Sequence, residues 1–99
     1  MIRTYKSQDP NAGLMYMRVK ALQYNGDPHD KEFIDFIGHK PDIPHEDQFY
    51  DDRIFIQGAV GTIALYPGWY VLRALADDAI FVWKGDIFED TYEEVRDDG

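Results

Sequence analysis

The sequence predicts a single α+β domain: an antiparallel β-meander that curls toward a small, partly open barrel, with one helix packed on it. Residues 53–83 contain four short runs rich in β-branched and aromatic side chains, each ended by Gly, Pro or Asp, a pattern typical of antiparallel strands. Residues 28–38 place Phe33, Phe36 and Ile37 at helical spacing. The 99-residue chain is 44% hydrophobic, enough for one core without disulfides.

The N-terminal residues 1–14 are polar and contain Asp9-Pro10 and Gly13, so we expect a flexible arm ahead of a domain over residues 15–99. Residues 16–24 predict the first strand. Alternation places its side chains on two faces, Met17, Val19 and Ala21 on one and Tyr16, Arg18, Lys20 and Leu22 on the other.

The helix over residues 28–38 has recognisable ends. Asp27 can cap its free N–H groups, and Pro28 suits the first helical position because no donor is needed there. Gly38 stands where a glycine ends a helix. Residues 39–52 then predict a long surface loop, since they hold two prolines and many Asp and His residues.

The strands that follow are expected at residues 53–57, 60–66, 69–75 and 79–83. Gly58, Pro67-Gly68 and Asp77-Asp78 mark the turns between them. Residues 86–95 fit two structures, an amphipathic helix capped by Asp86, or a turn and a strand that pairs with a sheet edge. We favour one helical turn at residues 86–90 followed by an extended end.

The charge is strongly unbalanced, with 19 acidic and 10 basic residues and a formal net charge of −9. Such a surface repels phosphate backbones, which disfavours direct binding of nucleic acid and favours a partner protein with a basic surface. Charge that serves only solubility is the alternative. No run approaches the roughly 20 apolar residues that span a membrane, so we expect a soluble protein of a bacterial host cytoplasm.

The composition points away from catalysis. There is no cysteine, and the one serine lies in the predicted arm without a partner base. The carboxylate doublets are poor acid–base pairs, because adjacent strand residues point to opposite faces. We interpret His39 and His45 as solvated loop residues and not as metal ligands. We therefore expect no enzyme, no cofactor and no metal site.

Aromatic and acidic side chains of residues 66–95 are the candidate binding residues. The adjacent Trp69 and Tyr70 cannot both be buried on one face of a strand, so some aromatic surface should be exposed as an interface anchor. The predicted partner-binding set is Trp69, Tyr70, Arg73, Trp83, Asp86, Glu89, Asp90, Glu93 and Glu94.

Four segments in order resemble a family of small phage and prophage proteins. Residues 19–27 are similar to its first motif, residues 33–38 to its helix, residues 67–73 to its PGDYG-like turn, and residues 84–95 to its KPDIFEATYE-like ending. The resemblance covers about residues 16–95 and implies a phage origin and this fold, but no chemistry. The acid that follows Pro-Gly in the family is replaced here by Trp69, so no catalytic acid is implied at that turn.

Two functions from different classes remain open. The first is a non-enzymatic phage accessory protein that inhibits a host factor, such as a defence effector, with an acidic face that mimics nucleic acid. The second is a nucleotide or small-molecule binder, a sponge for a signal, with Trp69, Tyr70, Trp83, Arg73 and Lys84 as its pocket. A virion or structural component, dimeric through an exposed edge strand, is a further alternative.

Overall fold

The computed structural model describes residues 2–8, 18–44 and 52–95. This part of the chain forms two helices and seven strands, in an antiparallel α+β fold, as predicted. In chain order the elements are β1 (Arg3–Ser7), β2 (Arg18–Gln23), α1 (Lys31–Ile37), β3 (Ile54–Gly58), β4 (Gly61–Leu65), β5 (Tyr70–Ala74), β6 (Ile80–Trp83), α2 (Gly85–Thr91) and β7 (Tyr92–Glu94).

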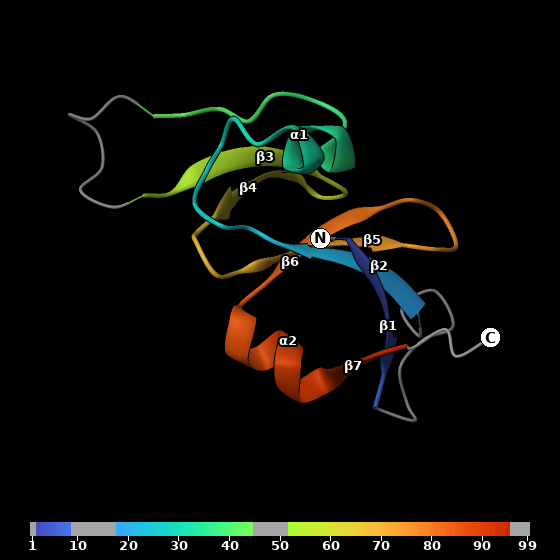
Figure 1. Ribbon diagram of the computed structural model, residues 1–99. Helices are drawn as coiled ribbons and strands as arrows, with labels where there is room; N and C mark the ends of the chain where they lie inside the picture. The colour runs from blue at the N-terminus through green and yellow to red at the C-terminus, as the bar shows by residue number, and fades with distance from the viewer. Residues whose placement is uncertain (1, 9–17, 45–51, 96–99) are drawn as a thin grey trace.

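The main sheet has five strands in the order β6-β5-β2-β1-β7, and β3 and β4 form a separate two-stranded sheet. Figure 1 shows α1 and the β3–β4 hairpin on one side of the main sheet and α2 on the other. The two sheets meet at a corner, where the Ala59 N–H donates to the Ile80 carbonyl at 2.9 Å. The main sheet is covered on both faces, which decides where each candidate residue lies.

Each face of the main sheet has its own core. One core joins Leu22 and Val71 of the sheet to Phe33 and Phe36 of α1 and to the β3–β4 hairpin. The other is built around Phe88 of α2 on the opposite face. Its sheet residues include Val19, Ala21, Tyr70 and Leu72. Since side chains alternate along a strand, one short β5 contributes to both cores.

The predicted flexible arm is wrong for residues 3–7, which form β1. This strand lies inside the sheet, antiparallel to β2 on one side and to β7 on the other. Its sequence is polar because Arg3 and Lys6, on opposite faces of the strand, form ion pairs with β7 instead of entering a core. The polar composition of residues 3–7 therefore gave no indication of this strand. Residues 9–14 of the predicted arm lie outside the described residues.

The hairpins β3–β4 and β5–β6 form with the predicted turns, but the strands between them do not run as one continuous meander. β5 pairs with β2 instead of β4. The cause is the Pro67-Gly68 turn: Gly68 has a φ of 88°, and the Trp69 N–H donates to the Tyr66 carbonyl at 3.1 Å. Tyr24 then holds the turn through two backbone hydrogen bonds, to Gly68 and Trp69, and this directs β5 along β2.

The helix α1 begins at Lys31, three residues later than the predicted start at residue 28. The Asp27 carboxylate accepts the His29 N–H at 2.9 Å and forms a turn before the helix, so Asp30 takes the N-cap position. The predicted end is confirmed: Gly38 has a φ of 80° and its N–H donates to the Ile34 carbonyl. Phe33, Phe36 and Ile37 are buried as expected.

The C-terminal segment follows the favoured interpretation, a short helix and then an extended end. α2 ends at Thr91, and β7 pairs with β1. The predicted cap is two residues off, because Lys84 is the N-cap and Asp86 lies in the first turn, where its Oδ1 accepts the Ile87 N–H at 2.9 Å. Residues 45–51 of the predicted loop lie outside the described residues.

Candidate functional site

The predicted aromatic anchors lie on opposite faces of the sheet. Tyr70 is only 8% exposed and faces α2, with its ring stacked on Phe88 at a centroid distance of 4.2 Å. Trp69 packs against the other core and lies 4.7 Å from the Tyr66 ring. The two residues do face opposite ways, as alternation predicts, but Tyr70 is not an exposed anchor, because α2 covers its face.

The predicted aromatic pocket with Arg73 and Lys84 does not form. The register pairs Trp83 with Tyr70 and Ile80 with Arg73, so Trp83 and Arg73 point to opposite faces. Trp83 is half-buried and its ring makes an edge contact with Tyr92 at 5.4 Å. The Lys84 ammonium lies 5.9 Å from the Trp69 ring. The sheet therefore separates residues that the sequence places close together.

Carboxylates gather on the outer surface of α2. Asp86, Glu89 and Asp90 are exposed and stand at i, i+3 and i+4 of this helix. Ile87 borders this strip beside Asp86 and Asp90 and is 49% exposed. These four residues, called the α2 surface below, combine negative charge with one exposed apolar side chain.

Glu89 is tied to the core beneath the helix. The Tyr70 hydroxyl donates to Glu89 Oε1 at 3.1 Å. Burial and then this hydrogen bond raise the pKa of Tyr70 to about 12. The Tyr70 hydroxyl thus keeps its proton well into the alkaline range, and its hydrogen bond ties the Glu89 carboxylate to the core beneath the helix.

Glu93 and Glu94 do not extend the α2 surface as predicted. They are consecutive residues of β7, so they point to opposite faces of the sheet. Glu93 lies 3.2 Å from the Lys6 ammonium and Glu94 lies 2.9 Å from the Arg3 guanidinium. Both carboxylates are therefore neutralised by β1, and the acidic face is narrower than the sequence indicated.

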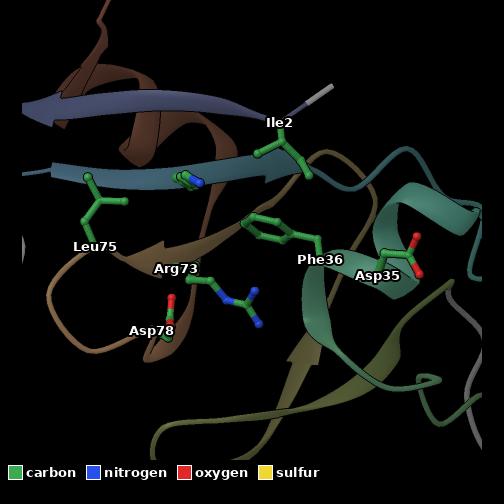
Figure 2. Close-up of a pocket in the computed structure, with 7 residues that line it drawn as sticks. Ile2, Asp35, Phe36, Arg73, Leu75 and Asp78 are labelled. Carbon is green, nitrogen blue, oxygen red and sulfur yellow. The ribbon is translucent and has the colours of Figure 1, made fainter.

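A second candidate site lies on the opposite face of the sheet, beside α1. Arg73 of β5 and Lys20 of β2 are direct cross-strand partners there, and both line a cavity of about 270 Å³. Figure 2 shows the side chains that line this cavity, with Phe36 of α1 directed toward the sheet. Its lining residues are Ile2, Lys20, Asp35, Phe36, Arg73, Leu75 and Asp78.

Among the residues of this cavity, sequence reasoning assigned a binding role only to Arg73. Alternation along residues 18–22 does separate Lys20 from Val19 and Ala21, so part of the signal is present in the sequence. The sequence does not show the strand register that places Lys20 opposite Arg73, nor the position of α1 that adds Phe36 to the cavity.

His39 has a structural role. The Gln57 N–H donates to His39 Nε2 at 3.1 Å, and Nδ1 lies 3.0 Å from the Ile37 carbonyl oxygen. An accepting Nε2 and a donating Nδ1 correspond to a neutral imidazole that joins α1 to β3. His45 lies outside the described residues, and within those residues no group of three or more His, Asp or Glu is arranged to hold a metal ion.

No helix in the described ranges is long and apolar enough to cross a membrane. Comparison of the chain with models of known protein families, with curated protein sequences and with solved structures finds no match. The fold and the two surfaces around α2 and Arg73 are therefore the basis for the function proposed below.

Proposed function

We propose that this protein is a non-enzymatic protein-binding module whose α2 surface engages a basic surface of a partner protein. The observation that carries this proposal is the exposed Ile87 beside the carboxylates Asp86 and Asp90, with Glu89 continuing the acidic strip around α2. An apolar anchor beside charged side chains is common in protein interfaces. The net charge of −9 adds a long-range attraction to a basic partner.

The α2 surface is presented rigidly. Phe88, on the inner side of the helix, is 1% exposed and contacts the rings of Tyr5, Tyr70 and Tyr92. The hydrogen bond from Tyr70 fixes Glu89 from below. A surface that is already ordered loses less conformational entropy on binding, which favours affinity.

The partner class follows from charge and from the resemblance to phage proteins. A row of carboxylates on a helix can occupy a groove that normally holds phosphates. We propose that the partner is a host protein with a nucleic-acid-binding surface, such as a defence effector, and that occupation of this surface inhibits it. The protein itself is proposed to act without enzymatic chemistry.

Charge reversal tests this proposal. The double variant Asp86→Lys/Asp90→Lys reverses two carboxylates of the α2 surface, while Asp35→Lys reverses an exposed carboxylate of α1 on the opposite side of the sheet. We expect capture of nucleic-acid-binding proteins from a bacterial lysate by the wild type and by the control, and its loss in the double variant. With a captured partner, association should slow as salt rises from 50 to about 300 mM.

Competition provides the second measurement. A DNA or RNA oligonucleotide should displace the protein from its partner, since both are proposed to occupy one basic groove. Capture that is equal for the double variant and the Asp35→Lys control, and indifferent to salt, would contradict the proposal.

Dimerisation stays a prediction. β6 and β7 are the end strands of the main sheet, and an edge strand can pair with a second copy. Sedimentation of the purified chain at several concentrations measures this directly: a mass that is independent of concentration and equal to one chain excludes it.

A further inference from the structure

Two positive side chains face each other across strands β2 and β5 of a strongly acidic protein. Lys20 and Arg73 are direct cross-strand partners, and both line the cavity beside α1. Like charges directly opposite in an antiparallel sheet repel and destabilise the pairing. A negatively charged ligand between them would remove this repulsion.

Arg73 is preorganised but incompletely satisfied. Its guanidinium carbon lies 5.5 Å from the centroid of the Phe36 ring, within the range of a cation–π contact. Its Nε atom is buried, and no acceptor for it occurs among the described residues. A buried donor without an acceptor is costly, so the protein alone leaves part of the hydrogen-bonding capacity of this guanidinium unused.

The other lining residues set the charge and size of a ligand. Asp35 and Asp78 also border the cavity, and Figure 2 shows the Asp35 carboxylate directed away from Arg73. The two cations and two carboxylates of the lining together carry no net charge, so the site favours a ligand with one negative charge over a ligand with several. The volume of about 270 Å³ is at the lower end for ligand sites and fits a molecule of about one ring.

We propose that this cavity binds a small organic carboxylate that carries an apolar group. Arg73 and Lys20 would receive the carboxylate, because a guanidinium fork matches its two oxygens. The apolar group would pack on Phe36, Ile2 and Leu75, which supply the nonpolar part of the lining. The proposal is independent of partner binding, since α1, which lines the cavity through Asp35 and Phe36, and α2 lie on opposite faces of the main sheet (Figure 1).

Titration followed by amide NMR shifts tests the site, with phenylacetate as the probe and phenylacetamide as its neutral analogue. We expect phenylacetate to shift the amides of β2, β5 and α1 with a dissociation constant in the millimolar range or below. The amide should bind at least about tenfold more weakly, because it lacks the charge.

Three variants locate the binding. Lys20→Gln and Arg73→Gln each remove one cation from the cavity, whereas Arg18→Gln removes a cation of the same strand and face that does not line it. We expect Lys20→Gln to weaken binding about three- to tenfold and Arg73→Gln more than tenfold, while Arg18→Gln changes it less than twofold. Because Lys20 is exposed, its variant tests the site even if Arg73→Gln fails to fold.

Several results would overturn the proposal. They are the absence of phenylacetate shifts at 20 mM probe, equal binding of phenylacetamide, or an effect of Arg18→Gln as large as that of Lys20→Gln. Phenyl phosphate is the last probe of the titration. If it binds more than tenfold tighter than phenylacetate, the cavity is a phosphate site and the carboxylate assignment is wrong.

Discussion

Gly85, the first residue of α2, lies directly against the carbonyl oxygen of Gly68 in the turn before β5. A Cβ atom at Gly85 would stand 2.5 Å from that oxygen. The N-terminus of α2 therefore packs on the Pro67-Gly68 turn through a contact that only glycine permits. This contact joins two segments that the sequence separates by 17 positions (85 − 68).

The first prediction concerns this contact. Gly85→Ala should lower the free energy of unfolding by about 1–3 kcal/mol, since the added methyl group must displace backbone. Glycine-to-alanine changes in helices otherwise stabilise the protein by roughly 1 kcal/mol. The sign of the change in the free energy of unfolding therefore shows whether the clash or the helix propensity of alanine dominates. Urea denaturation measures it, with Asp90→Ala in the same helix as a control that should stay within about 0.5 kcal/mol. A neutral or stabilising Gly85→Ala would show that the close approach is absent.

The second prediction separates the two sides of α2. Phe88 is 1% exposed, whereas its neighbour Ile87 is 49% exposed. Phe88→Ala should cost about 3–5 kcal/mol, because it leaves a cavity among three tyrosine rings. Ile87→Ala should cost less than about 1 kcal/mol but weaken capture of the proposed partner. Thermal melts and the lysate capture assay measure the two effects. Similar destabilisation by both variants would mean that α2 is not docked through Phe88.

The third prediction concerns alkaline pH. Burial raises the pKa of Tyr24 and of Tyr70 to about 12, while an unfolded tyrosine titrates near pH 10. The folded state holds these protons more tightly, so stability is fully present below pH 10 and decreases as the pH rises toward 12.

Tyr70→Phe isolates one of these groups. Each unit of pKa shift corresponds to about 1.4 kcal/mol, so the stability lost between pH 9 and pH 11.5 should be smaller in the variant by about 1–2 kcal/mol. Urea denaturation at the two pH values measures this difference. A pH dependence identical to that of the wild type would contradict the buried, protonated state of Tyr70.

The fourth prediction tests the N-terminal strand. Deletion of residues 2–7 removes β1, which pairs with both β2 and β7, so we expect loss of cooperative unfolding or a severe decrease in stability. The double variant Arg3→Gln/Lys6→Gln removes the two ion pairs but keeps the strand. It should cost less than about 1 kcal/mol, because exposed ion pairs contribute little. A deletion variant as stable as the wild type would mean that these residues are a dispensable arm.

Local chemistry explains which elements the sequence could predict. The Phe33–Ile37 spacing with Gly38, the Pro67-Gly68 turn and the Asp77-Asp78 hairpin each depend on residues close together in the chain, and all three occur. In the last of these, Asp78 has a φ of 59° and Asp77 Oδ1 accepts the Ala79 N–H. Such features follow from backbone preferences that neighbouring residues set.

The N-terminal strand shows where that reasoning fails. Residues 3–7 carry no apolar alternation, and their position in the sheet depends on pairing with β7, more than 80 residues away. The helix start was placed too early for a local reason, since Asp27 used its carboxylate in a turn with His29 instead of a cap. Long-range pairing therefore decided the strand, whereas two competing local structures decided where the helix begins.

The sequence by itself determined the α+β class, the two hairpins, the helix of Phe33 and Phe36, the helical turn with an extended end, and the negative charge of α2. Only the tertiary structure decided which residues share a surface. Covering both faces of the sheet buried Tyr70, and β1 neutralised Glu93 and Glu94. The β2–β5 register brought Lys20 to Arg73. Periodicity tells which side chains of one strand share a face, whereas register and layer order depend on long-range packing, which no local pattern encodes.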